Sequence, residues 1–148
     1  MTSVLSPLSL DETRKRVLVC DDDADIVFLI KTTLALAGYD VTTAGGHREF
    51  SEKFDPAIPP NLILMDVRMP EQDGFSIAEG LGSGVRVPII FVTAHDRPVY
   101  RLYAPIAGGV DYVTKPFDPD DLVCRVKKAM TTDPRSSNSF LQRVVCKH

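Results

Sequence analysis

The sequence is poor in cysteine and has no long hydrophobic run. Its three cysteines, in 148 residues, cannot all pair with one another, and none has the spacing of a metal site. No apolar stretch approaches the length that spans a membrane, and residues 1–16 lack the apolar core of a signal peptide. These absences predict a cytoplasmic protein in a reducing compartment.

An excess of either charge is also missing. Lys and Arg number 17 and Asp and Glu number 20, which gives a net charge of −3. A protein that binds nucleic acid or an anionic membrane through its general charge would be basic, so neither partner is expected. The length fits a single domain that buries roughly two-thirds of its unfolded surface.

The most informative stretch is a short apolar run that stops at a carboxylate. Residues 62–65 are Leu-Ile-Leu-Met, and Asp66 follows directly, before a turn-forming segment with Pro70 and Gly74. Such a run, bounded by turn signals, is typical of a strand buried inside a parallel sheet. Ligands of open α/β sheets bind at the carboxyl ends of the strands. We therefore take Asp66 as the candidate reactive residue.

The remaining chain alternates between strand-like and helix-like segments. We predict strands at residues 17–20, 39–43, 62–66, 88–92 and 110–114, and helices at 24–37, 47–54, 75–81, 98–104 and 119–130. Five alternations predict an α/β protein with a doubly wound parallel sheet. We expect a flexible leader at residues 1–15, one domain at 16–130, and a tail or truncated linker at 131–148, in which the apolar residues have helical spacing.

Polar residues follow four of the predicted strands. These residues are Asp21 with Asp22, Asp66, Thr93 and Lys115. Parallel strands bring them to one edge, where three carboxylates repel one another unless a cation lies between them. Mg²⁺ prefers such oxygen ligands. A carboxylate nucleophile beside a metal, a lysine and a hydroxyl is suited to accept a phosphoryl group.

Four segments, in this order, resemble the receiver domains of two-component response regulators, the chemotaxis regulators among them. They are residues 19–23 (VCDDD), 64–74 (LMDVRMPEQDG), 91–94 (FVTA) and 111–117 (DYVTKPF). The resemblance covers about residues 16–130. It implies a flavodoxin-like sheet of five parallel strands in the order 2-1-3-4-5, with helices on both faces.

The resemblance also implies roles for individual residues. Asp66 corresponds to the phosphoacceptor, and Asp21, Asp22 and Asp66 would bind Mg²⁺ together with the backbone carbonyl of Arg68. Mn²⁺ could replace Mg²⁺. Asp22 and Asp66 would be direct ligands, whereas Asp21 would act mainly through water.

Three further positions match the family's pattern. Lys115 and Thr93 would contact the phosphoryl group, and Thr93 with Tyr112 would form a switch pair in which the aromatic ring turns inward. For Tyr112 a role in the core is a competing interpretation. The resemblance also implies a cis peptide bond between Lys115 and Pro116.

The function implied is a signalling module that catalyses its own phosphorylation and is not a metabolic enzyme. A histidine kinase or a histidine phosphotransfer protein would provide phosphohistidine. The downstream partner would be a protein or an output domain absent from this chain. We expect a monomer or a phosphorylation-dependent dimer, without direct binding to nucleic acid or membrane.

Two other functions compete with this interpretation. A haloacid-dehalogenase-like phosphohydrolase also uses an Asp nucleophile, Mg²⁺, Thr and Lys, but Asp25 replaces the expected Thr or Val and no room remains for a cap domain. A receiver-like interaction module that no longer needs phosphate is the third possibility.

Two residues depart from the family's pattern. Pro105 falls inside the fourth predicted helix, where proline removes a backbone hydrogen bond, so we predict a short, kinked or displaced helix over residues 98–104. Arg68 stands two residues after Asp66, where a cation could contact phosphate or shield it from water.

Overall fold

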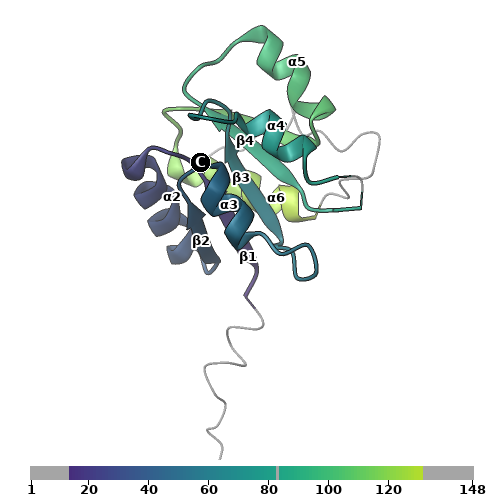
Figure 1. The fold of residues 1–148 in the computed structure, drawn as a ribbon. Helices are drawn as coiled ribbons and strands as arrows, with labels where there is room; N and C mark the ends of the chain where they lie inside the picture. Colours follow the sequence, from purple (N-terminus) through teal and green to yellow (C-terminus); the bar gives the residue numbers. More distant parts are fainter. Residues whose placement is uncertain (1–13, 83, 132–148) are drawn as a thin grey trace, which may run out of the picture.

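The chain forms five strands and five helices over the residues that the computed structural model describes, 14–82 and 84–131 (Figure 1). The strands are β1 (Arg16–Cys20), β2 (Asp40–Ala44), β3 (Leu62–Asp66), β4 (Ile89–Thr93) and β5 (Gly109–Thr114). The helices are α2 (Ala24–Leu36), α3 (His47–Lys53), α4 (Gly74–Glu79), α5 (Pro98–Ile106) and α6 (Pro119–Met130).

All five strands run parallel in one sheet, in the order β2-β1-β3-β4-β5. β3 lies at the centre and is buried along its whole length, as its uninterrupted apolar sequence requires. The register pairs Cys20 with Met65 and Asp66 with Val92, so the carboxyl ends of β1, β3 and β4 lie side by side. This arrangement confirms the predicted fold class and strand order.

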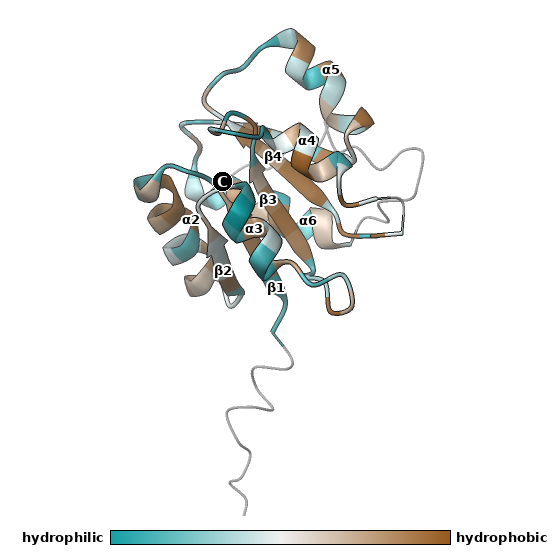
Figure 2. Cartoon of the chain, in the orientation of Figure 1, coloured by the Kyte–Doolittle hydropathy of each residue, from teal (hydrophilic) through white to brown (hydrophobic). Residues whose placement is uncertain are grey.

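Helices cover both faces of the sheet and enclose two apolar cores. α2 and α6 pack on one face, where Leu34 and Leu122 lie against alternate strand residues such as Leu64. α3, α4 and α5 cover the other face, where Phe50 and Phe75 join a second core. The hydropathy colouring shows the central strands as predominantly apolar (Figure 2). No helix among the described residues is both long and apolar enough to span a membrane.

Carboxylates begin two of the helices that flank the candidate site. The side chain of Asp23 accepts hydrogen bonds from the backbone N–H groups of Asp25 and Ile26, and that of Asp118 accepts one from Asp120. Such caps satisfy backbone donors that have no partner within the helix. Asp23 is therefore a structural residue, whereas its neighbours Asp21 and Asp22 remain available for the site.

The fourth predicted helix is longer than the sequence suggested. We expected it to end at Ala104 because of Pro105, but α5 continues to Ile106 and contains Pro105 in its last turn. Pro105 removes the hydrogen bond that an N–H there would donate to the Arg101 carbonyl, and the helix ends one residue later. The bounds of β3 and α6 match the prediction, and the other elements differ from it by at most two residues at either end. The predicted leader and tail lie almost wholly outside the described residues.

Candidate functional site

Three carboxylates meet at the carboxyl edge of the sheet. Asp21 and Asp22 follow β1 directly, and Asp66 is the last residue of β3. One carboxylate oxygen from each lies within 4.8 Å of the other two. Asp21 and Asp66 are buried, whereas Asp22 is exposed. This geometry suits a hard divalent cation held by oxygen ligands, with one side of the site open to solvent.

Lys115 brings a positive charge to the same cluster. Its Nζ atom lies 2.8 Å from Oδ2 of Asp21 and 3.6 Å from Oδ1 of Asp66. The side chain is only 10% exposed, so solvent screens these ion pairs weakly. The peptide bond between Lys115 and Pro116 is cis, as the family resemblance implied. The amide of Lys115 also donates a hydrogen bond to the Thr93 carbonyl, which fixes the loop against β4.

The carboxyl group of Asp66 has a pKa well above that of an ordinary aspartate. Burial, followed by the nearby charge of Asp21, raises its pKa to about 7, while Lys115 acts in the opposite direction. The protein without metal therefore holds more negative charge at this edge than one lysine balances. Such an imbalance favours the binding of a cation.

The loop after β3 approaches Asp66 more closely than any residue with a side chain would permit. The Gly74 amide donates a hydrogen bond of 2.8 Å to the Val67 carbonyl. A Cβ atom added at Gly74 would lie 2.0 Å from the backbone oxygen of Asp66. Only glycine allows this contact, and it sets the conformation of the loop that carries Arg68.

Thr93 ends β4 beside the cluster and is fully buried. Its Oγ1 atom accepts a hydrogen bond of 3.0 Å from the backbone N–H of His95. In this conformation the hydroxyl is engaged with its own loop. The hydroxyl accepts this bond, so its own O–H remains free to donate to a group bound at Asp66.

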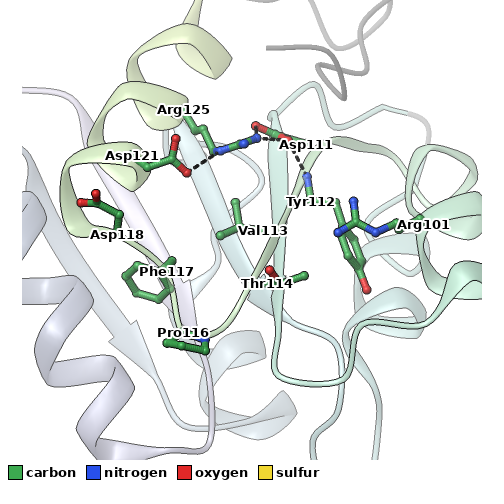
Figure 3. Close-up of a pocket in the computed structure, with 10 residues that line it drawn as sticks. All are labelled: Arg101, Asp111, Tyr112, Val113, Thr114, Pro116, Phe117, Asp118, Asp121 and Arg125. Atoms are coloured by element: carbon green, nitrogen blue, oxygen red, sulfur yellow. Dashed lines mark hydrogen bonds and ion pairs between the residues drawn. The ribbon is translucent and has the colours of Figure 1, made fainter. Parts of the chain in front are cut away.

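Tyr112 lies in β5, with its ring buried on the face covered by α5. The guanidinium carbon of Arg101 lies 4.7 Å from the ring centroid, within the range of a cation–π contact. Figure 3 shows Arg101 beside the Tyr112 ring. The ring of Tyr112 is thus directed inward.

A hollow of about 270 Å³ lies between β5, α6 and Arg101 (Figure 3). Arg125 of α6 lies at one side of it, 2.9 Å from Oδ1 of the buried Asp111 and 2.8 Å from Oδ2 of Asp121. Burial raises the pKa of Asp111 although Arg125 acts against this shift. The pair with Asp111 joins α6 to β5, and the pair with Asp121 lies within α6, so their role is structural.

Arg68 extends away from the acidic cluster to α5. Its Nη1 atom donates a hydrogen bond of 3.3 Å to the hydroxyl of Tyr100. The side chain is exposed. The structure thus places this guanidinium at the rim, where it connects the loop after β3 to α5.

The structure brings together most residues that the sequence singled out. Asp21, Asp22, Asp66 and Lys115 form one cluster, Thr93 borders it, and Tyr112 lies two residues before the end of β5. Sequence analysis missed the contact between Arg101 and Tyr112, because nothing in the spacing of the two residues indicates it. It also gave Gly74 only a turn-forming role.

Comparisons with known proteins agree with this geometry. Residues 17–127 match the family model of the response regulator receiver domain. A probable transcriptional regulator ycf27 of Porphyridium aerugineum is 35% identical over 129 residues, which cover 86% of this chain and 53% of that protein. The alkaline phosphatase synthesis transcriptional regulatory protein PhoP of Bacillus subtilis is 37% identical over 114 residues, 76% of this chain and 47% of that protein. The chain thus spans about half the length of these two relatives.

Solved structures show the same fold. A CheY-like receiver domain protein of Methanospirillum hungatei superimposes with a TM-score of 0.73 at 30% identity, over 80% of this chain and 95% of that one. The chemotaxis protein CheY4 of Vibrio cholerae gives a TM-score of 0.72 at 28% identity, over 78% of this chain and 98% of that one. The chain therefore belongs to the response regulator receiver domain family.

Proposed function

We propose that this chain is the phosphoacceptor of a two-component or phosphorelay system of the cytoplasm. Asp66 would take a phosphoryl group from phosphohistidine on a histidine kinase or a histidine phosphotransfer protein. The observation that carries the proposal is the position of Asp66. It is buried at the end of the central strand, with the Lys115 ammonium 3.6 Å away and two more carboxylates within 4.8 Å.

The donor set fits Mg²⁺, and Mn²⁺ could substitute for it. Asp21, Asp22 and Asp66 offer carboxylate oxygens, and the backbone carbonyl of Arg68 would complete the protein ligands. When bound, such an ion offsets the negative charge that builds up on the phosphoryl oxygens during transfer. The excess negative charge of the cluster supports this assignment.

The transfer itself needs few residues. A carboxylate oxygen of Asp66 forms a bond to phosphorus while the bond from phosphorus to the donor's imidazole nitrogen breaks. The electron pair of the broken bond stays on that nitrogen, so the donor histidine is regenerated. Lys115 would place its charge on a phosphoryl oxygen, and the hydroxyl of Thr93 would donate a hydrogen bond to another.

The consequence of phosphorylation would be a shift between two conformers. Contacts that exist only in the phosphorylated state favour the conformer that makes them. The Oγ1 atom of Thr93 accepts the hydrogen bond from His95, and its O–H remains free to donate to a phosphoryl oxygen, so a movement of this hydroxyl would also move the loop of His95. Self-phosphorylation of this kind makes the chain a signalling module, with a downstream protein or an output domain outside this chain as its target.

Intact-mass analysis tests the proposal. The full chain is incubated with a small phosphodonor such as phosphoramidate, with Mg²⁺ or with a chelator, beside Asp66→Asn and Asp40→Asn. Asp40 is an exposed carboxylate at the start of β2 and serves as the matched control. We expect one phosphoryl adduct on the wild type and on Asp40→Asn, only with Mg²⁺, and none on Asp66→Asn. No adduct under conditions that label another receiver domain would favour a phosphate-independent interaction module.

A further inference from the structure

The loop of residues 94–97, between β4 and α5, connects the candidate switch residues physically. The amide of His95 donates a hydrogen bond of 3.0 Å to the hydroxyl of Thr93. The next residue, Asp96, accepts two hydrogen bonds from Arg101, of 2.8 and 3.1 Å. Arg101 in turn covers the ring of Tyr112. One short loop and one ion pair therefore join the Thr93 hydroxyl to the aromatic ring.

The hydroxyl of Tyr112 does not hold its ring in place. This hydroxyl is buried and meets no hydrogen-bond partner with good geometry in the part of the chain that the structure describes, although the backbone N–H of Arg97 lies near enough to oppose the rise in its pKa that burial causes. A buried polar group without a partner costs free energy, which favours a ring that swings out to water. Packing and the Arg101 guanidinium, 4.7 Å from the ring centroid, must oppose that tendency.

Asp96 fixes the guanidinium over the ring. Two parallel hydrogen bonds between an arginine and a carboxylate restrict the orientation of the guanidinium plane. The two side chains are 52% and 46% exposed, so the pair is solvated and weak by itself. An ion pair of this strength can open when the loop moves.

We propose that Asp96 and Arg101 form a clamp that holds Tyr112 inward in the unphosphorylated protein. Asp96 orients Arg101, and Arg101 keeps the ring in its pocket. The ring is then inward before any phosphoryl group arrives, so phosphorylation would change Thr93 and the loop more than the ring. This consequence rests on the proposed function, whereas the clamp itself is testable without a phosphodonor.

Nitration of tyrosine by tetranitromethane, followed by peptide mass spectrometry, measures how often the ring is exposed. The full chain is compared with Arg101→Ala, Arg101→Lys and Asp96→Asn, with no phosphodonor present. Arg86→Ala is the matched control, because Arg86 is an exposed arginine in the connection between α4 and β4, outside the loop of residues 94–97. Nitration of Tyr39 in the same sample serves as the internal reference for folding.

We expect Arg101→Ala to raise the nitration rate of Tyr112 about two- to fivefold relative to Tyr39, the factor that corresponds to a cation–π contact at an exposed site. Loss of the Arg101 charge alone would raise the pKa of Tyr112 and slow nitration, so a faster rate reports exposure of the ring. Arg101→Lys should recover part of the protection, and Asp96→Asn should be intermediate. An unchanged rate in Arg101→Ala, or an equal rise in Arg86→Ala or at Tyr39, would overturn the clamp. Because no phosphodonor is used, failure of Asp66 phosphorylation would leave this result unaffected.

Discussion

The Nζ atom of Lys115 lies 2.8 Å from a carboxylate oxygen of Asp21, although 94 positions of sequence separate the two residues. In chain order, Asp21 follows the first strand, β1, and Lys115 follows the last strand, β5. The parallel sheet brings their carboxyl ends to one edge, and the cis bond after Lys115 lies in the loop that carries the lysine there. Lys115 thus neutralises part of the acidic cluster in the protein without metal, and it lies close enough to Asp66 to act on a group bound there.

The first prediction concerns pH. The folded protein raises the pKa of Asp66 to about 7, so between about pH 4 and pH 7 the folded state binds more protons than the unfolded state. The unfolding free energy of the protein without metal should therefore fall as the pH rises through this window, and this contribution should level off above it. The shift from 3.8 to about 7 corresponds to about 4 kcal/mol at 1.4 kcal/mol for each unit of pKa, and solvent at the open side of the cluster lowers the expected fall to roughly 1–2 kcal/mol.

Urea unfolding at pH 5 and pH 8, with a chelator present, measures this effect. Asp66→Asn cannot titrate, so it should be more stable than the wild type at pH 8 and closer to it at pH 5. Parallel stability profiles for the two proteins would contradict the raised pKa.

The second prediction concerns the metal. Mg²⁺ binds the folded state, so it should raise the unfolding free energy by about 1.4 kcal/mol at a concentration ten times its Kd. Asp22 is exposed, and Asp22→Asn should change the stability of the metal-free protein by less than about 0.5 kcal/mol. The same variant should lose most of the stabilisation by Mg²⁺, whereas Asp40→Asn should keep it. Equal Mg²⁺ responses in both variants would exclude Asp22 as a ligand.

The third prediction concerns Gly74. A Cβ atom at this position would lie 2.0 Å from the backbone oxygen of Asp66, so Gly74→Ala must displace the loop or the strand end. We expect a loss of about 3 kcal/mol in unfolding free energy, at the upper end of typical overpacking costs. Gly84→Ala, where an added Cβ meets no atom within 4 Å, is the matched control and should be nearly neutral. Thermal and urea unfolding measure the stabilities of the two variants. Equal stabilities would show that the loop can move to accept a side chain at position 74 without cost.

The cluster of carboxylates at the carboxyl edge of the sheet could be predicted because the sequence signals that mark it are local. Each of the residues Asp66, Thr93 and Lys115 stands at or directly after a strand whose apolar run marks its end. Parallel pairing then places these ends together without any further information. The caps at Asp23 and Asp118 were predictable for the same reason, since each precedes its helix directly.

Contacts between side chains of different elements could not be predicted in this way. Arg101 covers Tyr112, and Arg125 pairs with Asp111, only because α5 and α6 pack on opposite faces of β5. The orientation of a helix on its sheet depends on packing, which the periodicity of one segment does not determine. Pro105 misled us for a related reason. Proline removes one hydrogen bond from a helix, but α5 continues to Ile106 in spite of that loss.

The most direct test of the account identifies the phosphorylated residue. The full chain is phosphorylated in the presence of Mg²⁺, treated with borohydride, digested and sequenced by mass spectrometry. Borohydride reduces an aspartyl phosphate to homoserine, so the modified position is recorded in the peptide. We predict homoserine at position 66 alone, and none when the chelator replaces Mg²⁺. Homoserine at another aspartate, or an adduct that does not need Mg²⁺, would contradict the assignment of Asp66 as the phosphoacceptor.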